Sequence, residues 1–347
     1  MGAMSAAVPI SSPRSPRVRR RVGWTAAAAV ALLAAVLFSL AVGARATAPA
    51  QVFDALWNDA PGAAGAVVRE MRLPRTVVGL MVGAALAVAG TALQGITRNP
   101  IADPGVLGIS HGASLGVVVA MTLTGVQSLA GYVWWAFGGA ALASVAVYAI
   151  AARGRGGATP VKLALAGAAI NALLLSVVHA VLTTHAAVLD RFRFWQVGTL
   201  PSLDTGIPGK LWPFLLVGMV LVFCVARGLD ALALGEDVAK GLGQNVAAVR
   251  IVGGIGATLL TGAGVAAAGP IAFVGLAVPH IARALVGTDH RWLLPMSALL
   301  GPVVLLVADT VGRVVFPPSE VPSGVMTALI GVPFLIALVR RKKAVAA

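Results

Sequence analysis

Few ionisable side chains interrupt the long apolar stretches of this chain, and these few limit the chemistry that it can perform there. The candidates are Asp309, His179, His185 and His280, which are residue types that relay protons or ions inside a membrane. Arg313 follows Asp309 four residues later, a spacing that pairs an acid with a base along a helix. We therefore expect Asp309 and Arg313 to form a structural pair and the three histidines to be packing residues.

The sequence contains no motif that could bind and hydrolyse ATP. A phosphate-binding loop needs Gly-x-x-x-x-Gly-Lys followed by Ser or Thr, and the nearest segment, Gly206-Ile-Pro-Gly209-Lys210-Leu211, has the wrong spacing and no hydroxyl. Cys224 is the only cysteine, which excludes an intrachain disulfide and a cysteine metal cluster. We predict that the chain is not an enzyme and holds no metal or cofactor, so active transport would draw its energy from another polypeptide.

The composition predicts an all-α protein built in a lipid bilayer. Hydrophobic residues make up 59% of the 347 residues and charged residues 11%, against about 25% charged residues in an ordinary soluble domain. Apolar runs long enough to cross a bilayer, about 20 residues each, recur from Trp24 to the C-terminus. About ten transmembrane helices are expected, at 24–43, 76–95, 107–124, 133–152, 162–184, 207–226, 247–267, 271–286, 292–312 and 322–339.

The basic residues behind the net charge of +14 lie at the ends of the apolar runs, where they indicate topology and not nucleic-acid binding. Clusters of them within 1–23 and at 340–343 predict that both termini face the cytoplasm. Residues 1–23 are therefore expected to form a basic cytoplasmic tail. The run at 24–43 is longer than the roughly 7–15 apolar residues of a signal peptide, so it is predicted to remain as the first span.

A series of specific motifs runs through the chain from about residue 45 to residue 343. The motifs are Arg72-Leu-Pro-Arg75-Thr, Gly90-Thr-Ala-Leu-Gln94-Gly, Arg98-Asn-Pro100-Ile-Ala-Asp103-Pro104-Gly105-Val-Leu-Gly108-Ile-Ser110-x-Gly112, Phe194-Trp195-Gln-Val-Gly198, Gly235-Glu236-Asp-Val-Ala239-Lys-Gly-Leu242-Gly243, Ala268-Gly269-Pro270-Ile-Ala-Phe273-Val-Gly275 and Glu320-Val-Pro-x-Gly324. Together they resemble the FecCD/BtuC-type permease family of bacterial ABC importers for iron-siderophores, haem and cobalamin. The stretch from Arg72 to Gly112 and the Phe194-Trp195-Gln motif favour the ferric-siderophore branch.

This resemblance implies the type II ABC importer permease fold, as a single transmembrane permease domain at 24–343 in the bacterial cytoplasmic (inner) membrane. It implies a subunit that moves an iron(III)-siderophore complex into the cytoplasm by alternating access, powered by a partner ATPase that binds ATP and Mg. The expected partners are a second permease subunit, with a heterodimer favoured over a homodimer, two cytoplasmic ABC ATPase subunits, an extracytoplasmic substrate-binding protein and the lipid bilayer. Import of cobalamin or haem, and an ATP-independent ion-coupled secondary transporter, stay open as alternatives.

The resemblance also assigns candidate site residues. Coupling to the ATPase, against the alternative of a solvated loop, is expected in a cytoplasmic segment at 228–246 and specifically at Glu236, Ala239, Gly241 and Gly243. Docking of the binding protein is expected at exposed basic residues of the outer face, which otherwise would reach lipid head groups. These residues are Arg72, Arg75 and Arg313, with Arg69, Arg191 and Arg193 matching less closely. The translocation path is expected to include Asn171, Ser176 and Thr183.

Prolines predict a sharp turn between the second and third spans. Proline removes a backbone donor and restricts the residue before it, so a helix is not expected to run through this segment. The turn residues are Asn99, Pro100, Asp103, Pro104 and Gly105. We expect either a plain loop here or an element that holds the cytoplasmic face together.

Overall fold

The computed structural model describes residues 16–43, 47–58, 62–126, 128–154, 159–201, 206–317 and 319–346, and within these ranges the backbone forms helices and no strand. The elements in chain order are α1 (Pro16–Ala41), α2 (Pro49–Trp57), α3 (Ala63–Ala66), the π-helix η1 (Val67–Arg72), α4 (Leu73–Thr97), the 3-10 helix η2 (Pro104–Leu107), α5 (Ile109–Thr124), α6 (Leu129–Ala151), α7 (Pro160–Thr184), α8 (Ala186–Gln196), α9 (Ile207–Cys224), α10 (Ala226–Ala233), α11 (Glu236–Gly241), α12 (Val246–Ala268), α13 (Val274–Val286), α14 (His290–Val315) and α15 (Ser323–Ala346). The prediction of an all-α protein is confirmed.

Each of the predicted spans contains an apolar helix. Seven helices in the described part of the chain are long and apolar enough to cross a membrane: α1, α4 continued back through η1, α6, α7, α9, α12 and α14. Three shorter apolar helices, Ile109–Thr124, Val274–Val286 and Ser323–Pro333, occupy the remaining predicted positions. The short helices α10 and α11 fall at the predicted coupling segment 228–246. The short helices α2, α3 and α8 are absent from the prediction, because apolar runs identify spans and not the connections between them.

α4 forms the centre of the bundle, because small residues let its neighbours approach its backbone. It packs against α12, α13 and α14, and most of its residues are buried. A Cβ on Gly83 would lie 2.6 Å from Cα of Pro302 in α14, and a Cβ on Gly90 would collide with the carbonyl oxygen of Gly275 in α13. A larger residue at either glycine would therefore push these helices apart.

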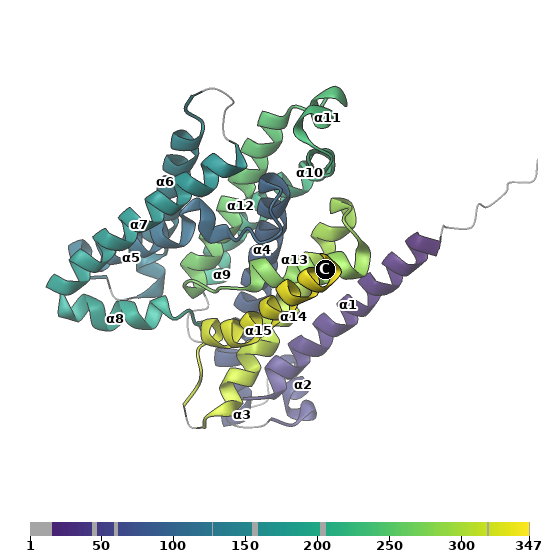
Figure 1. Ribbon diagram of the computed structural model, residues 1–347. Coiled ribbons are helices and arrows are strands. Elements are labelled where there is room, and N and C mark those ends of the chain that lie inside the picture. The colour runs from purple at the N-terminus through teal and green to yellow at the C-terminus, as the bar shows by residue number, and fades with distance from the viewer. Residues whose placement is uncertain are drawn as a thin grey trace, which may run out of the picture.

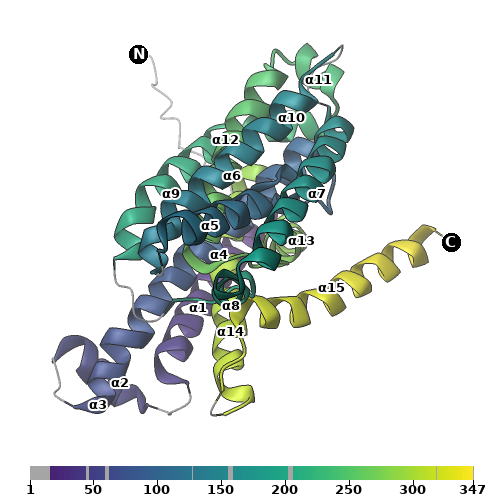
Figure 2. The same cartoon turned by 90° about the vertical axis from the view of Figure 1, so that its left-hand side faces the viewer.

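The two ends of the bundle carry different structures. α10 and α11 lie at one end, and α2 and α3 lie at the opposite end (Figure 1). The same arrangement is visible in Figure 2, where α15 leaves the bundle toward the C-terminus. α7, α8 and α15 expose large apolar side chains, among them Leu173, Phe194 and Leu329. Such uncovered apolar surface is suited to contact with lipid or with another protein.

Candidate functional site

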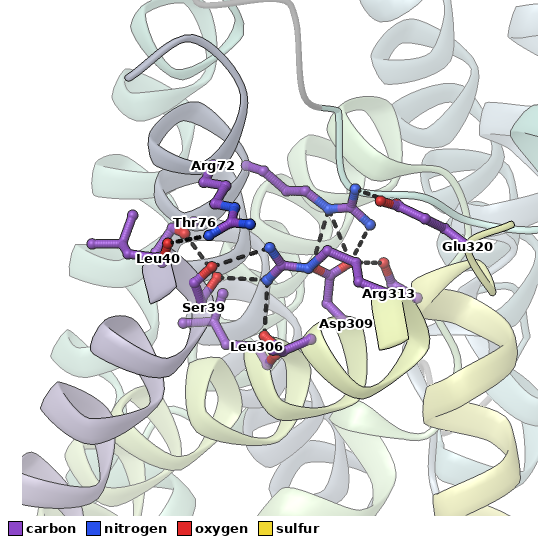
Figure 3. A network of polar contacts seen from close by, with 11 residues as sticks. Ser39, Leu40, Arg72, Thr76, Leu306, Asp309, Arg313 and Glu320 are labelled. Carbon is purple, nitrogen blue, oxygen red and sulfur yellow. Dashed lines mark hydrogen bonds and ion pairs between the residues drawn. The ribbon is translucent and has the colours of Figure 1, made fainter. Parts of the chain in front are cut away.

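A buried network of charges joins two spans and a loop at the α2–α3 end of the bundle (Figure 3). Arg75 lies in the first turn of α4, and Asp309 and Arg313 lie one turn apart in α14. Arg75 donates to Asp309 through Nη2 at 2.9 Å and Nε at 3.0 Å, and to Glu320 through Nη1 at 2.7 Å. Arg313 Nε lies 3.3 Å from Asp309 without the geometry of a hydrogen bond. The two-pronged bond from Arg75 to Asp309 is thus the stronger contact of this carboxylate.

The remaining donors of the network cap the end of α1. The last carbonyl groups of a helix lack partners within it, and their partial negative charge attracts cations. Arg72 Nη1 donates to the carbonyl oxygens of Leu40 and Ala41 at 2.8 and 2.9 Å, and Arg313 Nη1 donates to that of Ser39 at 3.0 Å. The network therefore fastens the C-terminal end of α1 to α4 and α14.

The structure corrects one expectation about these arginines. Arg72, Arg75 and Arg313 are 5%, 9% and 3% exposed, so the prediction that they are exposed on the protein surface is wrong. They turn inward because Asp309 and the open carbonyls of α1 supply the partners that a buried guanidinium requires. The pair of Asp309 and Arg313 is the structural pair that its spacing predicts. The spacing could not reveal the bond from Arg75 to Glu320, whose residues are 245 positions apart.

At the opposite end, α10, α11 and the following turn form an elbow that ends at Gly243. Gly235 joins the two helices with a φ of +117°, and Gly243 has a φ of +78°; glycine adopts such values because it has no Cβ. Ala239 is fully buried in α11, while a Cβ on Gly241 would meet open space. The elbow thus contains all four candidate coupling residues, the fourth of which is Glu236 at the start of α11.

Ion pairs and hydrogen bonds fasten the elbow to two spans. Glu236 accepts from Arg250 Nη2 of α12 at 2.9 Å and lies 3.1 Å from Lys240 Nζ. The hydrogen bonds from Arg250 and Lys240 lower the pKa of Glu236, which keeps it ionised at neutral pH. Asp230 of α10 accepts from the N–H of His290 at 2.9 Å and lies 2.6 Å from its ring Nδ1. The elbow is therefore joined to the N-terminal ends of both α12 and α14.

Three large apolar side chains of the elbow are left uncovered. Leu234, Val238 and Leu242 are 65%, 49% and 62% exposed, and we call them the elbow apolar patch. Isolated apolar side chains on a surface are common, but a group of them on one short connection is typical of a protein contact. The elbow thus combines a firmly held backbone with a surface that another protein could cover.

The predicted turn between α4 and α5 is packed inside the bundle. Asp103 accepts from the N–H of Gly105 at 2.8 Å and so caps η2. A Cβ on Gly275 of α13 would lie 3.1 Å from the Cδ of Pro104, and Asn171 Nδ2 of α7 donates to the carbonyl oxygen of Gly105 at 2.9 Å. The inner half of this turn therefore connects α5, α7 and α13.

The other candidates for the turn and the path lie on the surface. Asn99 and Pro100, at the start of the turn, are exposed. Ser176 and Thr183 are also exposed on α7, and each hydroxyl donates to a carbonyl of its own helix, at 2.8 and 2.9 Å. The three candidates for the translocation path therefore differ in their surroundings. The amide of Asn171 is bonded to the turn, whereas the hydroxyls of Ser176 and Thr183 lie on the surface and can accept a hydrogen bond from a transported molecule.

Several polar contacts have no counterpart in the sequence motifs. Glu236 and Arg250 are 14 positions apart, and Asp230 and His290 are 60 positions apart, so no helical spacing signals either pair. A half-enclosed polar cavity of about 250 Å³ between the turn, α5, α7 and α8 is likewise not visible in the sequence. A helical period reports neighbours within one helix only, whereas these groups meet through the fold.

The chain is similar to known transport proteins over most of its length. The model of the FecCD transport family matches residues 31–341. The probable siderophore transport system permease protein YfiZ of Bacillus subtilis (strain 168) is 39% identical over 310 residues, which cover 89% of this chain and 93% of that protein. The ferric enterobactin transport system permease protein FepD of Escherichia coli (strain K12) is 42% identical over 313 residues, which cover 90% and 93%. A solved inward-facing conformation, described as that of a metal-chelate type ABC transporter, aligns with a TM-score of 0.79 and 27% identity over 93% of this chain and 99% of that chain.

Proposed function

Because this chain belongs to the FecCD transport family, we propose that it is the permease subunit of an ATP-binding-cassette importer and carries an iron(III)-siderophore complex into the bacterial cytoplasm. The observation that supports this most strongly is the identity of about 40%, over about 90% of its length, to permeases named for siderophore and enterobactin transport. The inward-facing conformation of the related solved structure supports alternating access as the mode of transport.

Uptake of a radiolabelled iron(III)-siderophore by cells that lack this chain tests the proposal. The expected result is that uptake is lost in the deletion strain and returns when the chain is supplied again. Cobalamin or haem is the rival cargo for the same machinery. Loss of cobalamin or haem uptake with unchanged siderophore uptake would overturn the assignment of the substrate.

In this proposal two cytoplasmic ATPase subunits supply the energy, and the chain performs no hydrolysis itself. The acid at the centre of the buried network supports this view, because Asp309 is engaged by Arg75, Arg313 and Ser323 and is not free to relay protons. The rival is a secondary transporter coupled to ions. Uptake into vesicles that follows a proton gradient and does not respond to ATP would establish that rival.

We assign the elbow to the cytoplasmic side and to contact with the ATPase. The positive tail at 1–23 and the basic residues near the C-terminus support a cytoplasmic location of both chain ends, in which case α12 and α14 begin on the cytoplasmic side. The elbow apolar patch is the surface that the ATPase would cover, and the bonds of Glu236 and Asp230 would pass its movement to α12 and α14. The buried charge network then lies at the outer end.

Two further partners follow from the proposal. A second permease subunit would cover apolar surface of α7 and α15, and we favour a different chain over a second copy; isolation of a transport-active complex with this chain as the only permease would contradict that preference. The extracytoplasmic binding protein would dock at the outer end. Since Arg72, Arg75 and Arg313 are buried, direct contact falls to exposed basic residues such as Arg191 and Arg193 on α8, where charges set encounter rate and register.

A further inference from the structure

The polar cavity near the start of α5 has a wall made almost entirely of hydrogen-bonding groups. Asp103 comes from the turn, Ser110, His111 and Ser114 come from the first two turns of α5, and Gln196 comes from the end of α8. Positions 110, 111 and 114 are neighbours on one side of a helix. One face of α5 and the turn before it therefore present their polar groups to the same space of about 250 Å³.

The opposite wall of the cavity is apolar and leads to the surface. Leu175 and Val178 of α7 and Phe192 of α8 line it. Leu175 and Gln196 are exposed, whereas Val178 and Phe192 are buried. The cavity thus reaches the surface at its exposed lining residues, Leu175 of α7 and Gln196 of α8. A molecule that passes along α7 would meet this opening.

The third wall, at 270–272, is held in a fixed shape. Phe273 follows it with a φ of +69°, a conformation that costs energy for any residue with a side chain and that occurs where the surroundings enforce it. A Cβ on Gly331 of α15 would collide with Phe273, and a Cβ on Gly269 would collide with the carbonyl oxygen of Trp195 in α8. Packing from α8 and α15 therefore maintains the cavity.

One buried polar group of the cavity has no partner in the described part of the chain. Nδ1 of His111 is buried and makes no hydrogen bond there, while the half-buried Ser110 and the exposed Gln196 add further hydrogen-bonding groups to the same space. The carboxyl of Asp103 accepts from the N–H of Gly105 at 2.8 Å, and burial raises the pKa of this carboxyl. Buried polar atoms are normally satisfied, so the ring nitrogen of His111 calls for a hydrogen-bonding occupant of the cavity.

Covalent chemistry does not explain this wall. Gly108-Ile-Ser110-His111-Gly112 has the Gly-x-Ser-x-Gly spacing of hydrolases, but their serine lies on a turn between a strand and a helix and is activated by a histidine that an acid orients. Here the segment follows the 3-10 helix η2, and Nδ1 of His111 has no partner among the described residues. The groups are arranged to bind and not to react.

We propose that this cavity binds an oxygen-rich arm of the transported iron chelate, through hydrogen bonds to its carboxylate or carbonyl oxygens. A chelate that holds iron(III) through oxygen atoms carries such acceptors, and its organic backbone suits the apolar wall. The cavity of about 250 Å³ is smaller than the roughly 300–1,000 Å³ of a site that encloses a drug-sized ligand. It therefore takes one arm of the chelate and leaves the iron centre beside α7. This inference rests on the function proposed above.

Cysteine accessibility in the assembled transporter tests the proposal, since Cys224 is the only cysteine and its replacement by alanine leaves a clean background. Ser114→Cys places a thiol in the cavity, and Thr122→Cys serves as the matched control. Both hydroxyls donate to a carbonyl one turn earlier in α5, at 2.9 and 2.8 Å, but Thr122 lies outside the cavity. The probes are iron(III) complexes of a catecholate, a hydroxamate and citrate, each with the loaded binding protein, and a small thiol reagent reports accessibility.

The expected result is that a chelate which the complex transports slows modification of Ser114→Cys about tenfold at ten times its dissociation constant, and leaves Thr122→Cys unaffected. Transport of a chelate without any such protection would overturn the cavity assignment alone. Failure of the unmodified complex to transport all three chelates would instead count against the proposed function, and this inference would fall with it.

A second variant tests the cavity without a thiol. His111→Phe should fill the space and lower chelate uptake about tenfold, which corresponds to about 1.4 kcal/mol of lost interaction, while ATPase binding and the unfolding midpoint stay unchanged. Thr122→Val is the matched control and should transport normally. Normal uptake by His111→Phe, with the chain folded, would overturn the proposal.

Discussion

The buried charge network and the elbow both contain ion pairs, but they use them in different ways. In the network, Asp309 is fully buried and Arg75 is 9% exposed, and the partners bond to one another and to the end of α1. In the elbow, the side chains of Glu236 and Lys240 are 33% and 59% exposed, and the elbow apolar patch faces outward. Loss of one partner of a buried ion pair strongly destabilises the fold, because the other charge stays buried without compensation. An exposed ion pair contributes little to the free energy of unfolding. The buried charge network thus fastens helices to one another within the chain, whereas the elbow offers a surface to a partner protein.

The largest effect on stability is expected from Asp309→Ala, which removes the carboxylate that Arg75 and Arg313 share in the buried charge network. Arg75 and Arg313 would remain buried without it, and loss of one partner of a buried pair costs about 3–5 kcal/mol. Thermal unfolding of the purified chain in detergent measures this. Glu320→Gln is the control, because the side chain of Glu320 is 42% exposed and its loss should cost roughly 1 kcal/mol or less. Equal unfolding midpoints for Asp309→Ala and the unmodified chain would contradict a stabilising role of the buried charge network.

Arg72→Ala should have the next largest effect, because it leaves the terminal carbonyls of α1 without their donor. An unsatisfied buried acceptor costs about 1–3 kcal/mol, so the unfolding midpoint should fall clearly. Arg191→Ala, at an exposed position on α8, should leave the midpoint unchanged and weaken capture of the binding protein, most visibly at low salt. If Arg72→Ala instead weakened capture of the binding protein at an unchanged unfolding midpoint, Arg72 would be a docking residue and not a stabilising member of the buried charge network.

Val238→Asp should weaken association with the ATPase about tenfold, or about 1.4 kcal/mol, because a charge in a covered apolar contact loses its water. The fold should be unaffected, since Val238 is 49% exposed. Co-purification of the ATPase and ATP-dependent uptake measure the effect. Leu123→Asp, at a position that is 74% exposed near the C-terminal end of α5, is the control and should keep both. Full coupling in Val238→Asp would remove the elbow apolar patch from the interface.

The smallest effect is expected from Glu236→Gln, because the new amide oxygen can still accept from the buried Arg250 and the exposed pair with Lys240 contributes roughly 1 kcal/mol or less to the free energy of unfolding. The folded chain lowers the pKa of Glu236, so the stability from its pairs with Arg250 and Lys240 is present above the unfolded-state pKa of about 4.3 and is lost as the pH falls through the lowered value. The unfolding midpoint of Glu236→Gln at pH 7 should therefore differ slightly from that of the unmodified chain. A difference that grew as the pH fell below about 4 would contradict this sign.

The spans were predictable because each is a local property of the sequence. A polypeptide must satisfy its backbone hydrogen bonds within the bilayer, and a long apolar run can do so only as a helix or as part of a closed barrel. Prolines predicted the ends of helices less well. α4 ends at Thr97, before Pro100, yet Pro295 and Pro302 both lie inside α14. A proline inside a span can be accommodated by neighbouring helices, so its effect depends on packing that the sequence does not display.

The candidate coupling residues were equally accessible to motif reasoning, since they lie close together in one short segment. The polar cavity was not. Its groups come from a turn, from α5 and from α8, and only the fold shows that Ser110, His111 and Gln196 face one space. The stretch from Asp103 to Gly112 contributed to the family resemblance and to the predicted turn, but neither its residues nor their spacing indicated a cavity.

The sequence by itself determined where the apolar helices lie and which end of each apolar run carries charge, because both follow from residues that are adjacent in the chain. Tertiary structure alone decided the direction in which those charges point. Arg75 reaches Asp309 across 234 positions, and Arg313 reaches Ser39 across 274. A guanidinium turns inward only where packing brings a carboxylate or an open carbonyl within about 3 Å of it, and no local pattern encodes that meeting.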